Sequence, residues 1–516
     1  MVILKYRAAI IISAMIFLLL IGLSCKDEST TEPAGNKPVI VSFTANPSTV
    51  PAGGDSVKLT WKVDGATSLS ISSGVGTVTP NDSGSVTVFV SSSTTFTLKA
   101  TNSAGDVTAN ALVTVAQSIT VNGIVEDVDG QPVSGVTVMI KGKTPTTTDG
   151  NGGFSFSNVN TPYEVRVIMS IGQVAIVYQG LTVSNPTLLY LGSTALWKSA
   201  TIGGTVPPAA GKITTVFFVS GNMAWTTTAN QSTGSYSLVC DWKGSANSFS
   251  GQLQVLRWTQ NTSGMPEQYD AYGIEDNFTI SDGGIFNNHN FTAASLSDPQ
   301  ELNISGSIVR PSSSYELSSK TLYLTYESSA IYAKIYLGVE SGASLTDNFS
   351  YVVPSLAGAT FGVDVQGAFY GSITPRFTTY WKRSITGGSS GTTINLSSSP
   401  QLNLPAHNGS GIDTTTQFLW TKGSGGGISY ILIEPTSSGT GPTYYIFTGG
   451  NTTSIPNLAP QGLGLPSSVS YTWSVIQIFP LASVDEAASS SFPQLALGKK
   501  EGGEATSENF NFTTHP

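Results

Sequence analysis

The chain has 516 residues, of which 39% are hydrophobic and 11% charged, and its 23 lysines and arginines against 32 aspartates and glutamates leave a net charge of −9. This length is too great for one hydrophobic core and predicts several domains of about 100–150 residues, while the hydrophobic content excludes a disordered chain. Beyond the N-terminus no lysine/arginine cluster occurs, which argues against a nucleic-acid partner. Low charge, 55 glycines and short β-branched runs predict an all-β fold of tandem β-sandwich domains.

The N-terminal residues predict export from the cytoplasm. Lys5 and Arg7 precede an apolar run at 8–23, which is short for a membrane-spanning helix but fits the core of a signal peptide. Small residues then precede Cys25. Residues 1–24 resemble a bacterial lipoprotein signal peptide, although the leucine lies two rather than three positions before the cysteine. The resemblance implies a lipid on Cys25. An ordinary secretory signal is the alternative.

The tether at 25–37 follows directly. It is polar and contains a proline, which is typical of a flexible linker. Its Lys26, Asp27 and Glu28 resemble the Lys-acidic-acidic export signal of Bacteroidota surface lipoproteins. The resemblance implies an outer-membrane lipoprotein at the cell surface. A protein that faces the periplasm, or a secreted protein, is the alternative.

Short strands of alternating polarity fill residues 38–116. From Val57 to Val63 the apolar residues fall at every second position, which predicts a strand with one face in a core. With the runs PVIVSFTANPSTVPAGG, VKLTWKVDGATSLSI and TTFTLKATNSAG in order, the segment resembles a bacterial immunoglobulin-like domain. The resemblance places Trp61 in the core, at the tryptophan position of such folds.

Residues 117–195 alternate strands with glycine turns. The run ITVNGIVEDVDGQPVSGVTVMIKG is followed by TTTDGNGGFSF, and its Asp-Gly and Asn-Gly pairs predict tight turns between strands. The segment resembles a carboxypeptidase regulatory-like domain, a small transthyretin-like sandwich. This family implies no peptidase chemistry.

An internal repeat of about 100 residues occupies 196–401. The run IGGTV at 202–206 returns as ISGSI at 304–308, and SDPQELNI returns as SSPQLNL. We predict one β-sandwich copy at 196–300 and a second at 301–401. The opening strand of each copy also echoes VNGIV in the preceding segment, which suggests divergent relatives of that module.

Residues 402–516 have a different pattern. The strand-like runs begin at Gln417, Tyr430 and Tyr471. Their order, Phe-x-Trp, Tyr-x-Leu-x-Ile and Tyr-x-Trp-x-Val, resembles a fibronectin type III-like domain. The resemblance implies one further β-sandwich at the C-terminus.

Candidate metal ligands are few. The three histidines, His289, His407 and His515, do not lie at ligand spacing from one another. With Cys25 used for lipidation, a Cys/His zinc site lacks ligands, so we predict neither a metal nor a cofactor. Cys240, in the strand-like run SLVC, is then expected to be a buried and unpaired thiol.

Two patterns imitate functional loops. Gly387–Gly391 fits Gly-x-Ser-x-Gly, but a strand-like run follows where a nucleophile elbow needs a helix, so we predict a hairpin loop. Asp127–Gly130 and Asp149–Gly152 begin like calcium loops but lack the remaining ligands. We interpret both as turns, with weak calcium binding as the alternative.

Acidic residues cluster in the first repeat copy at Asp270, Glu275 and Asp276. We interpret them as a solvated face. A hydrolase site within 196–401 is the alternative, because paired carboxylates for sugar hydrolysis meet only in the fold. We predict no catalytic residue.

The tryptophans are the remaining candidates for a binding surface. Trp225, Trp242 and Trp258 lie in the first copy and Trp381 in the second. Core packing is the expected role, with an exposed sugar-stacking platform as the alternative.

We therefore predict a non-catalytic lipoprotein at the cell surface or in the periplasm that acts as an adhesion or binding scaffold, with the membrane and a glycan or surface protein as partners. A carbohydrate-binding lipoprotein of a polysaccharide-use system is the alternative.

Overall fold

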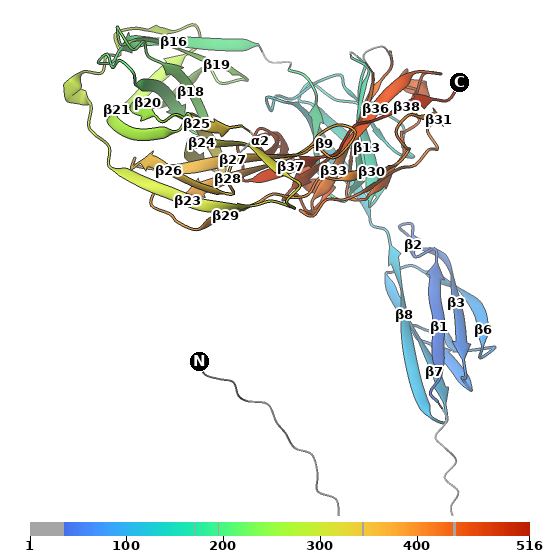
Figure 1. Ribbon diagram of the computed structural model, residues 1–516. Coiled ribbons are helices and arrows are strands. Elements are labelled where there is room, and N and C mark those ends of the chain that lie inside the picture. The colour runs from blue at the N-terminus through green and yellow to red at the C-terminus, as the bar shows by residue number, and fades with distance from the viewer. Residues whose placement is uncertain (1–35, 171, 194–195, 343–344, 437–439) are drawn as a thin grey trace, which may run out of the picture. The chain divides into compact units, whose positions relative to one another are not determined.

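The computed structural model describes residues 36–170, 172–193, 196–342, 345–436 and 440–516. It is built almost entirely of strands, and the prediction of an all-β chain of β-sandwiches is confirmed (Figure 1). Cys25, Lys26, Asp27 and Glu28 lie outside the described residues. The chain divides into two units, Met1–Val115 and Ala116–Pro516.

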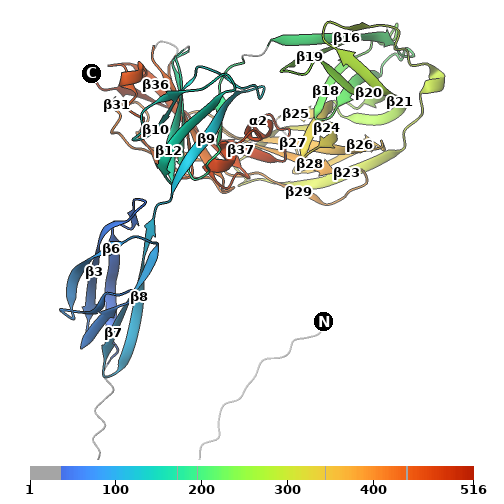
Figure 2. The same cartoon turned by 180° about the vertical axis from the view of Figure 1, so that it is seen from behind.

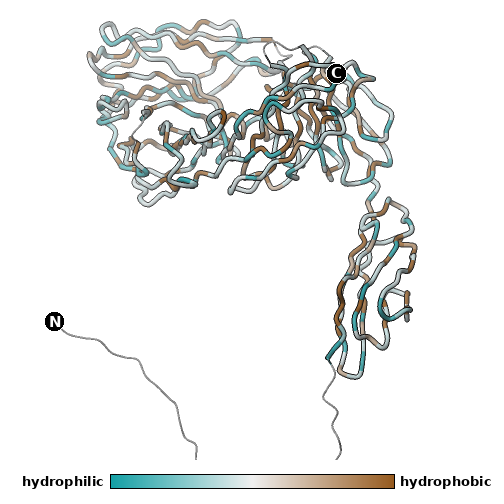
Figure 3. The backbone as a smooth tube through the Cα atoms, turned by 45° about the vertical axis from the view of Figure 1, so that its right-hand side comes forward, coloured by the Kyte–Doolittle hydropathy of each residue, from teal (hydrophilic) through white to brown (hydrophobic). Residues whose placement is uncertain are grey.

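The first unit is one sandwich of eight strands. Its two sheets have the orders β1-β3-β6 and β2-β8-β7-β4-β5. In β3 the buried residues alternate strictly with exposed ones, as the sequence predicts, and Trp61 lies in the core with its indole N–H donating to the carbonyl oxygen of Pro80 at 3.1 Å. Figure 3 shows hydrophobic and hydrophilic stretches interspersed along the backbone. The strands are β1 (Val39–Asn46), β2 (Thr49–Val50), β3 (Asp55–Asp64), β4 (Ser68–Ile71), β5 (Gly76–Val78), β6 (Ser83–Val90), β7 (Thr94–Asn102) and β8 (Gly105–Val115).

The second unit begins with a sandwich of seven strands, which we call the second sandwich. One sheet has the order β12-β9-β15, in which β15 runs parallel to β9, and the facing strands have the order β11-β10-β13-β14. The strands are β9 (Ser118–Asp127), β10 (Thr137–Ile140), β11 (Thr146–Thr147), β12 (Gly153–Asn160), β13 (Tyr163–Met169), β14 (Val174–Leu181) and β15 (Thr187–Tyr190).

The two repeat copies, here the third and fourth sandwiches, have the same strand order as each other. In the third the sheets are β19-β16-β22 and β18-β17-β20-β21, and in the fourth the corresponding orders are β26-β23-β29 and β25-β24-β27-β28. Both also match the second sandwich strand for strand, including the parallel pairing of first and last strands. This agreement supports a common origin of all three. The strands are β16 (Trp197–Thr205), β17 (Ile213–Ser220), β18 (Met223–Thr228), β19 (Ser235–Lys243), β20 (Ser248–Gln260), β21 (Pro266–Ser281), β22 (Ile285–Phe286), β23 (Glu301–Val309), β24 (Glu316–Ser328), β25 (Ile331–Ser341), β26 (Asn348–Pro354), β27 (Ala359–Phe369), β28 (Arg376–Ile385) and β29 (Thr392–Asn395), with a short 3₁₀ helix at Ala293–Ser295.

The fifth sandwich has another order. A sheet β30-β32-β35 faces the strands β34-β33-β36-β38, and β31 runs parallel to β38. Between β36 and β38 the chain makes two short helices and an additional strand, β37. The elements are β30 (Gln401–Leu404), β31 (Gly409–Ile412), β32 (Phe418–Thr421), β33 (Ile428–Pro435), β34 (Thr443–Thr448), β35 (Thr452–Thr453), a 3₁₀ helix (Ala459–Gln461), β36 (Ser470–Phe479), α1 (Val484–Ala487), α2 (Phe492–Ala496), β37 (Gly502–Thr506) and β38 (Phe510–Thr514).

One sheet of 14 strands connects three of these sandwiches, which the sequence did not predict. Its path runs β11-β10-β13-β14-β34-β33-β36-β37-β28-β27-β24-β25, from the second sandwich through the fifth to the fourth (Figure 2). Strand β14 pairs in parallel with β34, and β37 bridges β36 and β28. Because the backbone hydrogen bonds of this continuous ladder must break before the three sandwiches can move apart, the sheet holds them together more firmly than linkers would.

Strand β14 shows how the sequence permits this sheet. Ile176 and Tyr178 belong to the core of the second sandwich, whereas Ala175 and Val177 belong to the core of the fifth. A strand that is buried on both faces is expected to be apolar without alternation. The run VAIVY at 174–178 has this composition.

The third sandwich joins the fourth through side chains. Phe217, Leu256 and Trp258 share one hydrophobic core with Leu322 and Leu324. It also contacts the second sandwich, since an ion pair of 3.3 Å joins Lys243 to Asp129. Across the described ranges, no helix is long and apolar enough to cross a membrane.

Candidate functional site

The acidic residues of the first repeat copy do not converge. Asp270 is paired with Lys212 and Arg257, while the other two carboxylates have different partners. The expectation of a solvated face is wrong for Asp270, whose side chain is only 23% exposed. Burial alone would raise the pKa of Asp270, but the hydrogen bonds from Arg257 and Lys212 outweigh it and hold that pKa below its usual value.

The other two carboxylates each have a local partner. Glu275 lies 3.0 Å from Nδ1 of His289, and Asp276 accepts a hydrogen bond of 2.8 Å from the amide of Gln252. Each of the three carboxylates therefore has a polar partner of its own.

The two patterns that begin like calcium loops lie in turns. Asp127 accepts the backbone N–H groups of Asp129 and Gln131, and Asp149 does the same for two residues of its own turn. Both carboxylates therefore stabilise turns, as the interpretation from sequence expects. In the described part of the chain no group of three or more His, Cys, Asp and Glu side chains comes together as a metal site would require.

The Gly387–Gly391 segment is also a turn. It lies between β28 and β29, and the backbone N–H of Ser389 donates to the carbonyl oxygen of Thr386 at 3.1 Å. Because a strand rather than a helix follows at Thr392, Ser389 does not lie on a nucleophile elbow.

The thiol of Cys240 and the tryptophans at 225, 242 and 258 pack internally. Cys240 is buried on β19, and burial raises its pKa to about 12. Trp242 and Trp258 are buried, and Trp225 is half-buried against the ring of Phe218. Their role is in the core, as expected.

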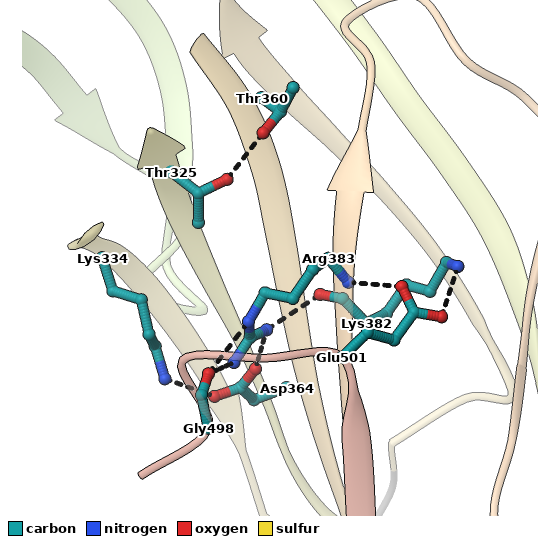
Figure 4. Close-up of polar contacts among 8 residues, drawn as sticks. All are labelled: Thr325, Lys334, Thr360, Asp364, Lys382, Arg383, Gly498 and Glu501. Atoms are coloured by element: carbon teal, nitrogen blue, oxygen red, sulfur yellow. Dashed lines mark hydrogen bonds and ion pairs between the residues drawn. The ribbon is translucent and has the colours of Figure 1, made fainter. Parts of the chain in front are cut away.

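Another group of paired charges lies on the fourth sandwich (Figure 4). Arg383 on β28 is fully buried and forms an ion pair with Asp364 on β27. Asp364 also accepts Nζ of Lys334, on β25, at 3.1 Å. We call Arg383, Asp364 and Lys334 the charged cluster. Strands β28 and β27 are neighbours in the 14-stranded sheet, and β24 lies between β27 and β25.

The charged cluster binds residues 480–501, which we call the clamp segment. The guanidinium of Arg383 donates to the carbonyl oxygen of Gly498 through Nε at 3.0 Å and through a second nitrogen at 2.5 Å. Glu501 closes the other side, where it accepts from Lys382 at 2.8 Å and from the backbone N–H of Arg383 at 3.2 Å. Each of these contacts joins the fourth sandwich to the clamp segment.

Burial shifts the pKa values of groups in and beside the charged cluster. Burial lowers the pKa of Lys334, and Asp364 offsets part of that effect. The neighbouring Tyr323, whose ring lies 4.2 Å from Nζ of Lys334, has its pKa raised to about 12, mainly by burial. One carboxylate between two cations is neither a free general base nor a free acid. The arrangement therefore holds the chain together rather than activating a substrate.

The other end of the clamp segment is hydrogen-bonded to the second sandwich. Asp485 accepts the backbone N–H of Thr182 at 2.8 Å, and the carbonyl oxygen of Ala488 accepts that of Thr187 at 2.9 Å. Phe492 packs edge-on against Phe447 of β34, with ring centroids 5.4 Å apart. The clamp segment thus contacts the second, fourth and fifth sandwiches at once.

Sequence reasoning missed the clamp segment. It lies inside the stretch that resembles a single fibronectin type III-like domain, and no local pattern sets it apart. A partial signal exists at 381–383, where Trp-Lys-Arg occupies a strand. An arginine at a position of a strand that faces a core requires a buried partner.

Comparison with known proteins adds one assignment. Residues 120–189 match the family model of the carboxypeptidase regulatory-like domain. This carboxypeptidase regulatory-like domain coincides with the second sandwich, so the resemblance seen in its glycine turns is confirmed. No curated protein matches the sequence.

Solved structures give distant likenesses. The Bacillus anthracis TIE protein is 12% identical, with 71% of this chain and 76% of that chain covered and a TM-score of 0.15. The full-length major pilin SpaD from Corynebacterium diphtheriae is 11% identical, with 54% and 97% covered and a TM-score of 0.14. Two B repeat units of the collagen binding protein of Staphylococcus aureus are 13% identical, with 78% and 100% covered and a TM-score of 0.11. TM-scores of this size carry no conclusion about this chain.

Proposed function

We propose that this protein is a non-catalytic scaffold for adhesion or binding, displayed from a membrane by a lipid on Cys25. The observation that carries the proposal is the 14-stranded sheet that joins the second, fifth and fourth sandwiches, with the clamp segment contacting all three. A binding surface composed of several domains keeps its geometry only if those domains do not move independently. A shared sheet provides that rigidity.

The distribution of charge supports a scaffold rather than an enzyme. The carboxylates that the hydrolase alternative requires are engaged with separate partners, and the charged cluster is closed by its own ion pairs. Loops at the ends of the sandwiches are then the places for recognition.

We propose that the fifth sandwich is a fibronectin type III-like module with an insertion. Its strands β30-β32-β35 and β34-β33-β36-β38 follow the two-sheet order of that module, and α1, α2 and β37 lie between the last two strands. We propose that the insertion converts a spacer module into the connector of the unit.

For the location, we propose an outer-membrane lipoprotein exposed at the cell surface, with Lys26, Asp27 and Glu28 as the export signal. The Cys25→Ala variant should be released from the membrane fraction, because it lacks the thiol that carries the lipid. A variant with Lys26, Asp27 and Glu28 all replaced by alanine should stay membrane-bound but become protected from protease added to intact cells. Retention of the Cys25→Ala variant on membranes would contradict the anchor, and unchanged protease sensitivity of the triple variant would contradict the export signal.

The scaffold function itself is tested by adhesion. Cells that display the wild-type chain should adhere to a glycan or matrix-protein surface more strongly than cells that carry the Cys25→Ala variant at equal expression. Equal adhesion of the two across a panel of glycans and matrix proteins would contradict the proposal.

Carbohydrate binding is the second candidate function. It is favoured by a cavity on the fourth sandwich whose lining residues include hydroxyl, amide, ammonium and carboxylate side chains.

A further inference from the structure

A cavity of about 450 Å³ opens beside β24, β25 and β26 of the fourth sandwich. This volume falls within the usual range of small-molecule sites, about 300–1,000 Å³. Ser263, from the loop between β20 and β21, contributes to its wall, so both repeat copies form the cavity. Ser341 and Ser350 of the fourth sandwich also line it, as do the apolar residues Leu345 and Phe349.

A buried lysine lies at this cavity. The side chain of Lys320 is only 2% exposed, and its Nζ lies 2.9 Å from Oε2 of Glu340 and 2.9 Å from the backbone carbonyl oxygen of Asn348. A lysine is seldom buried to this extent unless its charge is compensated. Glu340 supplies the compensation, and both side chains line the cavity.

Hydrogen-bonding capacity remains on both members of this pair. An ammonium group carries three N–H donors, and two acceptors account for two of them among the described residues. The Oε2 atom of Glu340 also accepts the hydroxyl of Tyr351 at 3.2 Å, whereas Oε1 has no partner in the described part of the chain. A donor and an acceptor are therefore left side by side.

The corresponding lysine of the third sandwich has a different environment. Lys320 lies eight positions before Ser328, where β24 ends, and Lys212 lies eight positions before Ser220, where β17 ends. Lys212 shares the carboxylate of Asp270 with Arg257. In the fourth sandwich, by contrast, the lysine lines a cavity.

We propose that this cavity binds a neutral sugar, with two hydroxyl groups of one ring bonded to Lys320 and Glu340. A hydroxyl group both donates and accepts, so adjacent hydroxyls of a sugar satisfy an adjacent donor and acceptor together. An anionic ligand is disfavoured because Glu340 already balances the charge of Lys320. The proposal deepens the proposed function by naming a ligand class, and it rests on that function only for its biological use.

The test is sugar binding by the purified full-length chain carrying Cys25→Ala, measured by ligand-detected NMR. The probes are glucose, galactose, mannose and N-acetylglucosamine, their β-linked disaccharides, and galacturonic acid as the charged comparison. Ser350→Arg introduces a long side chain into the cavity from an exposed strand position. Ser237→Arg makes the same change at an exposed position of β19, the corresponding strand of the third sandwich, and is the matched control. Glu340→Gln removes the acceptor charge while keeping the shape.

At least one neutral probe should bind the wild-type chain, and Ser350→Arg and Glu340→Gln should each weaken that binding at least tenfold, while Ser237→Arg leaves it unchanged. Absence of binding by every neutral probe, or equal binding by Ser350→Arg, would overturn the proposal. Tighter binding of galacturonic acid than of galactose would overturn the assignment to a neutral ligand. Cell adhesion is measured separately. A wild-type chain that binds sugar but gives no more adhesion than the Cys25→Ala variant would count against the proposed function alone.

Discussion

The guanidinium of Arg383 donates two hydrogen bonds to the carbonyl oxygen of Gly498, 115 residues further along the chain. Through this contact a strand of the second repeat copy holds the segment that also binds the carboxypeptidase regulatory-like domain. The order of the sandwiches along the sheet consequently differs from their order in sequence, and the last sandwich lies between the second and the fourth.

Replacing Arg383 should strongly lower the free energy of unfolding of the second unit. In Arg383→Met, Asp364 keeps Lys334 as a partner but loses its ion pair with the guanidinium, and the carbonyl oxygen of Gly498 loses two donors. Removing one partner of a buried pair costs about 3–5 kcal/mol. Denaturant unfolding of the second unit measures this loss. Lys382→Met, which removes a more exposed partner of Glu501, is the control and should cost less. Equal costs for the two variants would contradict the role given to Arg383.

The two units should unfold separately. Trp61 is buried in the core of the first unit, and truncating a buried tryptophan costs about 3–5 kcal/mol. Trp61→Ala should lower the unfolding midpoint of the first unit and leave that of the second unchanged, as followed by calorimetry. Trp473→Ala, in the core of the fifth sandwich, should have the reverse effect. A shift of both transitions by either variant would show that the units are coupled.

Cys240 should be unreactive in the folded protein. Burial raises its pKa to about 12, so at pH 8 the folded chain holds a protonated and inaccessible thiol, and only thiolates react readily. A thiol reagent should modify Cys240 only after denaturation, in a chain that carries Cys25→Ala. Rapid modification of the native chain would contradict the buried position.

The same shift gives a pH dependence of stability. The unfolded thiol loses its proton above about pH 8.5, whereas the folded thiol keeps it until the pH approaches 12. The unfolded state therefore binds fewer protons in this window, and stability falls as the pH rises through it. Cys240→Ala should reduce this part of the alkaline loss in denaturant titrations between pH 8 and 10, and an unchanged loss would contradict the shift.

Much of the local structure follows from the sequence. Alternation in β3 fixes which face is buried, and glycine turns identify the carboxypeptidase regulatory-like domain. The repeat is visible because its opening strands share short runs, and the strand order of the two copies agrees with it. These features depend on neighbours within about ten residues, which is the range over which periodicity carries information.

The joining of the sandwiches does not follow from local patterns. The pairing of β14 with β34 connects residues about 270 positions apart, and its only local trace is the unalternating run at 174–178. The clamp segment is likewise held by long-range contacts, such as that between Thr182 and Asp485. The cavity at Lys320 needs strands from one copy and a loop from the other.

The most direct test of the shared sheet is an engineered disulfide across β14 and β34. Val174 and Thr443 are paired partners at this junction, and both are half-buried. Partners in adjacent strands lie within reach of a disulfide. In the Cys25→Ala chain, Val174→Cys with Thr443→Cys should form a disulfide nearly completely under mild oxidation, whereas Val174→Cys with Thr448→Cys, five positions out of register, should not. Failure of the first pair to cross-link, or equal cross-linking of both pairs, would contradict the continuous sheet on which the scaffold account rests.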